Sequence, residues 1–131
     1  MDTSGHITRL SGEECRLLLR EHSIGRVAWL SPAGLQVLPV SYAVDGETIL
    51  FRTAPESVLA ALADGGVPVS FEVDDIDVVT ATGWSVLVRG EAGVGPAEPR
   101  VAPRPWAPGG RPLTIAITPS AYSGRAVSAD Q

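Results

Sequence analysis

The chain has 131 residues, a formal net charge of −5 and one cysteine, Cys15. This length predicts a single domain over residues 1–131. The acidic balance argues against nucleic-acid binding, because phosphate backbones attract clustered Lys and Arg. One cysteine excludes an intrachain disulfide and a Cys-cluster metal site, and we expect no metal. No apolar run approaches the length of a membrane span and no signal peptide is evident, so we expect a soluble cytoplasmic protein.

The N-terminal part predicts a tail followed by a helix. Residues 1–9 carry no periodic pattern, and we expect them to be flexible. Ser11 and Glu14 have the spacing of a capping box, which marks a helix start. Cys15, Leu18 and Leu19 then recur at helical spacing and predict one buried face.

Three strands are predicted next, at Ile24–Leu30, Leu35–Val44 and Thr48–Thr53. The alternation of the second strand slips at Pro39, and because Pro has no N–H to donate, we expect a bulge or a sheet edge there. Asp45-Gly46 predicts a tight hairpin turn, since both residues tolerate positive φ.

The third strand ends close to a predicted helix start, and this junction is a candidate phosphate site. Arg52 and Thr53 end the strand, and a helix is expected from Pro55 to Gly65-Gly66 with Ser57 near its start. Free N–H groups, hydroxyls and a guanidinium together favour an anion. The alternative is an ordinary hairpin followed by a capped helix.

The second half predicts three more strands, at Val67–Asp74, Trp84–Ala92 and Leu113–Thr118, with a flexible end at 126–131. Asp74, Asp75 and Asp77 are expected in a solvated acidic turn, because their spacing does not fit a calcium loop. The segment 93–112 contains six prolines and four glycines, so we expect it to be disordered or functional. Short strands with Gly/Pro turns favour a β-barrel, and no nucleotide-binding or hydrolase motif is present.

The order of these pieces resembles a known family. The pieces are IGRVAW, LPVSYAVDGETILFRT, VSFEVDDID, GWSVLVRGEA, the Trp106 region and SGR, spread over roughly residues 8–126. They are similar to FMN-binding split-barrel proteins related to pyridoxamine 5'-phosphate oxidase. The resemblance implies a mainly β fold, a six-stranded split β-barrel with an N-terminal helix and a short helix after the third strand. It also implies a homodimer with FMN in clefts at the interface.

The resemblance further implies a set of site residues. One strand runs along the flavin ring, the end of the next approaches the ribityl chain and phosphate, and Ser57 lies at the phosphate side. A later strand faces the flavin, often from the partner subunit, and Trp106 covers the ring. The implied cofactor-binding residues are Pro39, Val40, Ser41, Tyr42, Phe51, Arg52, Thr53, Ser57, Trp84, Ser85 and Trp106. For Arg125 in SGR no contact is assigned.

Two positions depart from the family pattern. Glu56 stands where Gly is usual, and Val58 stands where a phosphate-binding Lys is usual. We therefore expect a weakened phosphate site. The first functional hypothesis is an FMN-dependent oxidoreductase acting on a small substrate, with no residue identified as its acid or base. The alternatives are a flavin- or other ligand-binding dimer without turnover, a reductase that uses the deazaflavin cofactor F420, and a structural dimer with an empty cleft.

Overall fold

A computed structural model describes residues 6–103 and 110–129 of the chain. Strands dominate, and one α-helix and one 3₁₀ helix accompany them. The elements are β1 (His6–Arg9), α1 (Gly12–Glu21), β2 (Ile24–Ser31), β3 (Gly34–Asp45), β4 (Thr48–Thr53), η1 (Val58–Asp64), β5 (Val67–Asp77), β6 (Thr82–Val94) and β7 (Leu113–Ser128).

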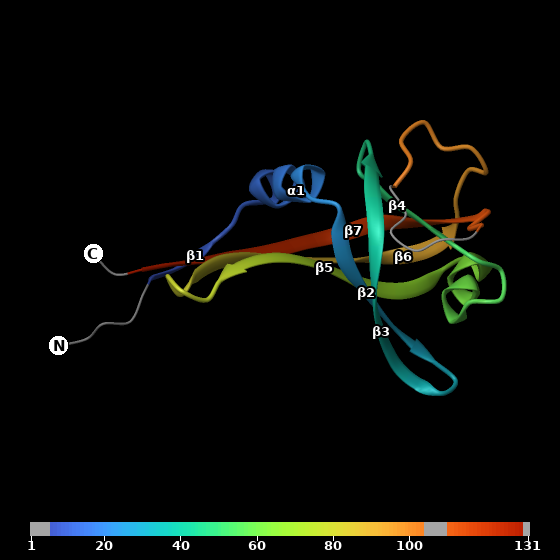
Figure 1. The fold of residues 1–131 in the computed structure, drawn as a ribbon, viewed down its shortest axis with the longest axis horizontal. Coiled ribbons are helices and arrows are strands. Elements are labelled where there is room, and N and C mark those ends of the chain that lie inside the picture. The colour runs from blue at the N-terminus through green and yellow to red at the C-terminus, as the bar shows by residue number, and fades with distance from the viewer. Residues whose placement is uncertain (1–5, 104–109, 130–131) are drawn as a thin grey trace.

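Six of the strands close into a ring. They follow the order β7-β4-β3-β2-β5-β6, every pairing is antiparallel, and a further pairing between β6 and β7 completes the circle. Figure 1 shows β5, β6 and β7 extending together to one end of the molecule, while the β2–β3 hairpin projects across them. Closure leaves fewer exposed strand edges. The predicted fold class, a six-stranded split barrel with two helices, is confirmed.

Both ends of the described chain form more of the sheet than we expected. We expected the last strand to end at Thr118, but β7 continues to Ser128. The expected flexible tail at residues 1–9 is wrong for His6–Arg9, which form β1 and pair with Arg125–Ser128. The other edge of this part of β7 pairs with β6. Long-range pairing therefore satisfies backbone groups in segments that carry no local strand pattern.

The predicted cap of α1 is present. Ser11 N–H donates to Glu14 Oε1 (2.8 Å), and Glu14 N–H donates to Ser11 Oγ (3.1 Å). Cys15 and Leu19 lie on the buried face of this helix. Among residues 6–103 and 110–129, neither helix has the length and apolar character to cross a membrane.

The short helix after β4 is a 3₁₀ helix rather than an α-helix. Ser57 is its N-cap, and the Leu59 N–H donates to Ser57 Oγ (3.1 Å). Leu59 and Leu62 are the buried residues of this helix. A 3₁₀ helix has three residues per turn, so residues at i and i+3 share one face. The helix ends where expected, at Gly65 and Gly66, whose φ values of 90° and 66° suit glycine.

Tyr42 connects the barrel interior to α1. Its side chain is 2% exposed and stands edge-on to Phe71, with ring centroids 5.0 Å apart. Its hydroxyl donates a hydrogen bond to the Leu19 carbonyl at 2.7 Å. Burial raises the pKa of Tyr42. The hydroxyl is therefore a neutral donor that fixes the end of α1 against β3.

Replacing Tyr42 by Phe should destabilise the protein, because the Leu19 carbonyl loses a buried partner. We expect Tyr42→Phe to lower the free energy of unfolding by about 1 kcal/mol. Tyr122→Phe is the matched control, since the Tyr122 hydroxyl makes no hydrogen bond within the described residues. Urea denaturation of both variants measures the difference, and equal losses would contradict the assigned role.

Candidate functional site

The ladder between β3 and β4 stops part-way along both strands. The last pair is Tyr42 with Phe51. Continued register would set Ser41 opposite Arg52, but from Ser41 back to Gly34 β3 pairs only with β2. Pro39 lies in this stretch and pairs with Arg26 of β2 on its other side, so its edge toward β4 is open and the sheet-edge expectation is confirmed. The β2–β3 register shows no shift, so no bulge is present between these two strands. This opening leaves backbone groups of both strands without ladder partners.

Alternation decides which side chains of β3 are available at the opening. Val40 and Tyr42 are buried and point into the barrel, whereas Pro39 is exposed and Ser41 is half-buried on the outer face. Val40 and Tyr42 can therefore offer only backbone groups to a ligand. The outer face continues with Leu35 and Val37, which are 82% and 63% exposed. These outward apolar residues explain the slip in the sequence pattern at Pro39.

The end of β4 presents one cation to the outer face. Phe51 and Thr53 are buried, and Arg52 lies between them with the opposite orientation. Arg52 Nη2 donates to the Ala97 carbonyl (3.2 Å), while its Nε is buried and has no partner in the described structure. Ser57 follows the strand closely, since its N–H donates to the Ala54 carbonyl (3.0 Å). The predicted junction of strand and helix is therefore present.

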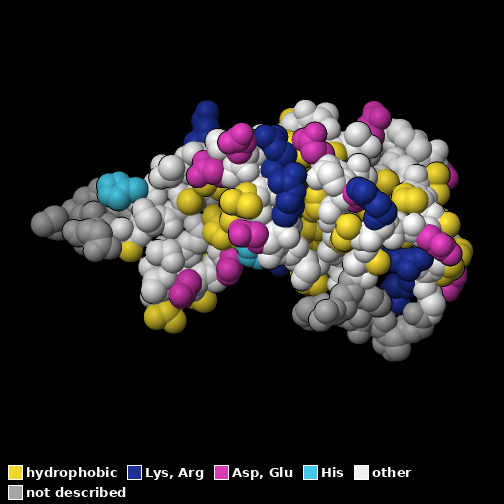
Figure 2. All heavy atoms as spheres, turned by 90° about the horizontal axis from the view of Figure 1, so that it is seen from above, with side chains coloured by type: hydrophobic (Ala, Val, Ile, Leu, Met, Phe, Trp, Pro, Cys, Tyr) yellow, Lys and Arg dark blue, Asp and Glu magenta, His cyan; other side chains and the backbone are white. Residues whose placement is uncertain are grey.

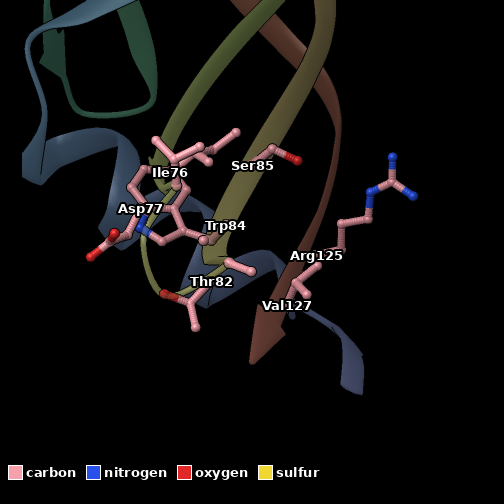
Figure 3. Close-up of a pocket in the computed structure, with 10 residues that line it drawn as sticks. Ile76, Asp77, Thr82, Trp84, Ser85, Arg125 and Val127 are labelled. Atoms are coloured by element: carbon pink, nitrogen blue, oxygen red, sulfur yellow. The ribbon is translucent and has the colours of Figure 1, made fainter. Parts of the chain in front are cut away.

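Trp84 and Ser85 lie in a different place, beside a cavity of about 450 Å³. The cavity is at the tip of the β5–β6 hairpin and the end of β7. The residues that line it are Ile76, Asp77, Val78, Ala81, Thr82, Gly83, Trp84, Ser85, Arg125 and Val127. Ser85 pairs directly with Arg125, and Figure 3 shows both side chains on the far side of β6 from the Trp84 ring.

The Trp84 ring faces α1. It stands edge-on to His22, with ring centroids 4.7 Å apart. Because neighbours in a strand point to opposite faces, Trp84 and Ser85 cannot both present side chains to one flat ligand. Ser85 is the one on the outer face of the sheet, together with Arg125.

The two groups of predicted site residues lie far apart in one chain. Arg52 pairs with Thr114 of β7, and Gly95, just past β6, donates its N–H to the Thr114 carbonyl (2.8 Å). The path along β6 from Trp84 to Gly95 is about 36 Å at a rise of about 3.3 Å per residue. Figure 1 shows these regions toward opposite ends of the long strands. Trp106, the remaining predicted residue, lies outside the described residues.

A pair of neighbouring carboxylates on β5, Glu72 and Asp74, was not predicted from the sequence. Asp74, Asp75 and Asp77 belong to β5 rather than to the expected turn, although Asp77 Oδ1 does accept the Val79 N–H (3.0 Å). Glu72 and Asp74 share the outer face of β5. The alternation of Phe71 and Val73 with Glu72 and Asp74 is the pattern that could have revealed this arrangement.

Arg26 Nη1 contacts both carboxylates of this cluster, Glu72 Oε1 at 3.4 Å and Asp74 Oδ1 at 3.5 Å. Partial burial raises the pKa of Glu72 to about 7, assisted by a hydrogen bond and the charge of Asp74 and opposed by Arg26. Arg26 of β2 pairs with Pro39 of β3 on one side and with Glu72 of β5 on the other. The strand β2 therefore lies between Glu72 and the open edge of β3.

Comparison with known proteins identifies the family. The family profile described as pyridoxamine 5'-phosphate oxidase matches residues 11–126, and the chain belongs to that family. An uncharacterized protein of Mycobacterium tuberculosis is 32% identical over 134 residues, which cover 95% of this chain and 88% of the relative.

Two solved structures extend the comparison. An FAD-binding protein from Mycobacterium smegmatis has 31% identity and a TM-score of 0.73, covering 92% of this chain and 98% of its own. A candidate pyridoxamine 5'-phosphate oxidase from Corynebacterium glutamicum has 25% identity and a TM-score of 0.78, covering 100% and 98%. The resemblance seen in the sequence is thus confirmed for family and fold.

The raised pKa of Glu72 predicts a pH-dependent stability. Folding moves this pKa from 4.5 to about 7, so the folded state binds the proton more tightly and stability falls as pH rises between these values. Glu72→Gln removes the titration. We expect it to be about 1 kcal/mol more stable than the parent at pH 8, after allowance for solvent screening, and equally stable below pH 4.5.

Urea denaturation at pH 4 and pH 8 checks this prediction. Glu91→Gln, at an exposed position of β6, is the control and should behave like the parent at both values. A Glu72→Gln variant that is less stable than the parent at pH 8 would mean that attraction to Arg26 outweighs the burial of the carboxylate.

Proposed function

We propose that the protein is a cytoplasmic homodimer that binds FMN and works as a flavin-dependent oxidoreductase on a small substrate. The observation that carries the proposal is the Arg52 guanidinium at the β3–β4 opening, whose Nε is buried without a partner. A positively charged donor that lacks an acceptor fits an anionic group such as the phosphate of a flavin nucleotide. The FAD-binding relative from Mycobacterium smegmatis supports a flavin as the ligand.

The separation of the two site regions supports the dimer. One chain holds Arg52 and Ser57 at one end of the long strands and Ser85 with Arg125 toward the other. A two-fold dimer can bring the hairpin end of one chain to the β3–β4 opening of its partner. Both places have apolar surface to cover, because Leu35 and Val37 near the opening and Ile76 and Val79 near the hairpin tip are all at least 63% exposed.

In this proposal the flavin supplies the redox chemistry, and the protein supplies binding and orientation. Arg52 pairs with the phosphate through charge-assisted hydrogen bonds. The edge of β3 at Pro39 to Ser41 offers unpaired backbone groups to the polar edge of the ring. Glu72 lies on β5, with β2 between it and this edge, and its pKa of about 7 lets it hold a proton near neutral pH.

A binding dimer without turnover is the second candidate, and Glu56 and Val58 favour it. Both side chains are outward, Val58 being 47% exposed; Val58 lacks the positive charge of the Lys that is usual at its position, and Glu56 adds a negative charge where Gly is usual. The deazaflavin cofactor F420 ranks lower, because its acidic tail needs a basic groove. Figure 2 shows Arg side chains spread over the viewed face and interleaved with acidic ones.

The first prediction from this proposal concerns the purified protein. We expect a flavin absorption spectrum to co-elute with a dimeric mass in light scattering at micromolar concentration, after incubation with FMN and gel filtration. Reduction of that flavin by NAD(P)H and reoxidation by a substrate would separate the oxidoreductase from the binding dimer. A monomer, or a protein that retains neither FMN nor FAD, would overturn the proposal.

The second prediction concerns a double variant that restores the residues usual at the phosphate site. Glu56→Gly with Val58→Lys adds positive charge beside Arg52 and should tighten FMN binding by about tenfold to a hundredfold. Most of this gain should disappear at 1 M salt, because screening removes surface electrostatics. The control pair Glu13→Gln with Leu17→Lys makes the same change of charge on α1. Equal FMN affinity in both double variants and the parent would show that the phosphate lies elsewhere.

A further inference from the structure

Two residues that each carry an unpartnered polar atom are neighbours on the outer face of β4 and β7. Arg52 and Thr114 are direct partners in the antiparallel ladder, so their side chains share one face. Arg52 Nε and Thr114 Oγ1 are both buried, and neither has a hydrogen-bond partner in the described structure. Thr114 as a whole is 2% exposed. No sequence motif marks this threonine as a binding residue.

The burial of Thr114 comes from the segment that follows β6. Gly95 donates its N–H to the Thr114 carbonyl (2.8 Å), and a Cβ on Gly95 would lie 2.9 Å from Thr114 Cγ2. The segment therefore rests against the methyl group of Thr114 and supplies no partner for its hydroxyl. Only a residue without a side chain permits this close approach.

Two further contacts hold this segment in place. The Ala97 carbonyl accepts from Arg52 Nη2 (3.2 Å), and Arg100 Nη2 is 2.6 Å from Asp45 Oδ1. Arg52 itself has no carboxylate partner among the described residues. A buried donor without an acceptor is costly, and two adjacent ones are rare in folded proteins. Their shared position is explained if one acceptor from outside the chain serves both.

We propose that Thr114 Oγ1 and Arg52 Nε together bind one oxyanion, the phosphate of the bound ligand. This inference rests on the proposed flavin site for the identity of the phosphate, and it adds Thr114 as a binding residue. The Arg52 Nε–H and the Thr114 hydroxyl both donate, and phosphate oxygens accept both bonds. The fixed charge of Arg52 favours an anion over water as the shared acceptor.

The test compares two ligands that differ in the phosphate alone. Thr114→Val removes the hydroxyl and keeps the shape, Thr114→Ser keeps the hydroxyl, and Thr118→Val makes the same change at an exposed position of β7. We expect Thr114→Val to weaken FMN binding about tenfold and to change riboflavin binding less than twofold, as measured by quenching of flavin fluorescence. Thr114→Ser and Thr118→Val should match the parent.

Thermal unfolding without ligand gives a second readout. Thr114→Val should raise the Tm, because it removes an unsatisfied buried hydroxyl, whereas a hydroxyl with a structural role would lower it. Arg52→Lys keeps the charge but lacks Nε, and it should weaken FMN binding more than riboflavin binding. Equal loss of FMN and riboflavin in Thr114→Val, or no loss of FMN, would overturn the inference while the proposed function stands.

Inorganic phosphate separates failure of this inference from failure of the flavin proposal. A parent protein that binds neither FMN nor riboflavin can still show a higher Tm in millimolar phosphate. If Thr114→Val and Arg52→Lys both lose this rise in Tm, the result still supports the oxyanion site. A parent whose Tm does not respond to phosphate and which binds FMN no better than riboflavin would overturn the site.

Discussion

The end of the β3–β4 ladder at Tyr42 and Phe51 is the constraint on which the candidate site depends. Up to that pair the two strands satisfy each other's backbone groups, and beyond it β3 keeps only β2 while β4 keeps only β7. The barrel tolerates this local loss of backbone hydrogen bonds, because the other pairings in the ring of six strands are intact. The opening places the free edge of β3 and the outward guanidinium of Arg52 at one site.

The electrostatics of that site centre on one arginine. Arg52 has no acidic partner in the described structure, while Glu56 nearby adds negative charge and Val58 adds none. In the proposed phosphate site the positive charge is therefore small, and hydrogen-bond geometry would have to contribute more of the affinity. Thr114, held under the segment after β6, is the neighbouring group that we propose contributes it.

The arrangement of the long strands connects site and assembly. β5 and β6 carry Ser85 and the cavity at their tip away from Arg52, and β7 runs the whole length between the two regions. A rigid antiparallel ribbon cannot fold back on itself to join them. The family to which the chain belongs gives the fold, whereas the division of the predicted site residues between two ends is the physical argument for the proposed second copy.

The sequence by itself determined the features that depend on neighbours within a few residues. The capping box of Ser11 and Glu14 and the Ser57 cap follow from local hydrogen bonding. The hairpin after β3 was also predicted, but its two turn residues are Gly46 and Glu47, because Asp45 still pairs with Thr48 and of these residues only Gly46 has a positive φ. The missing N–H of Pro39 allowed a bulge or an edge, and the strand register selects the edge. The tertiary structure decided the length of β7, the strand β1, the Glu72–Asp74 cluster and the burial of Thr114. These features arise from pairing and packing between segments far apart in the chain, whose register no local pattern specifies.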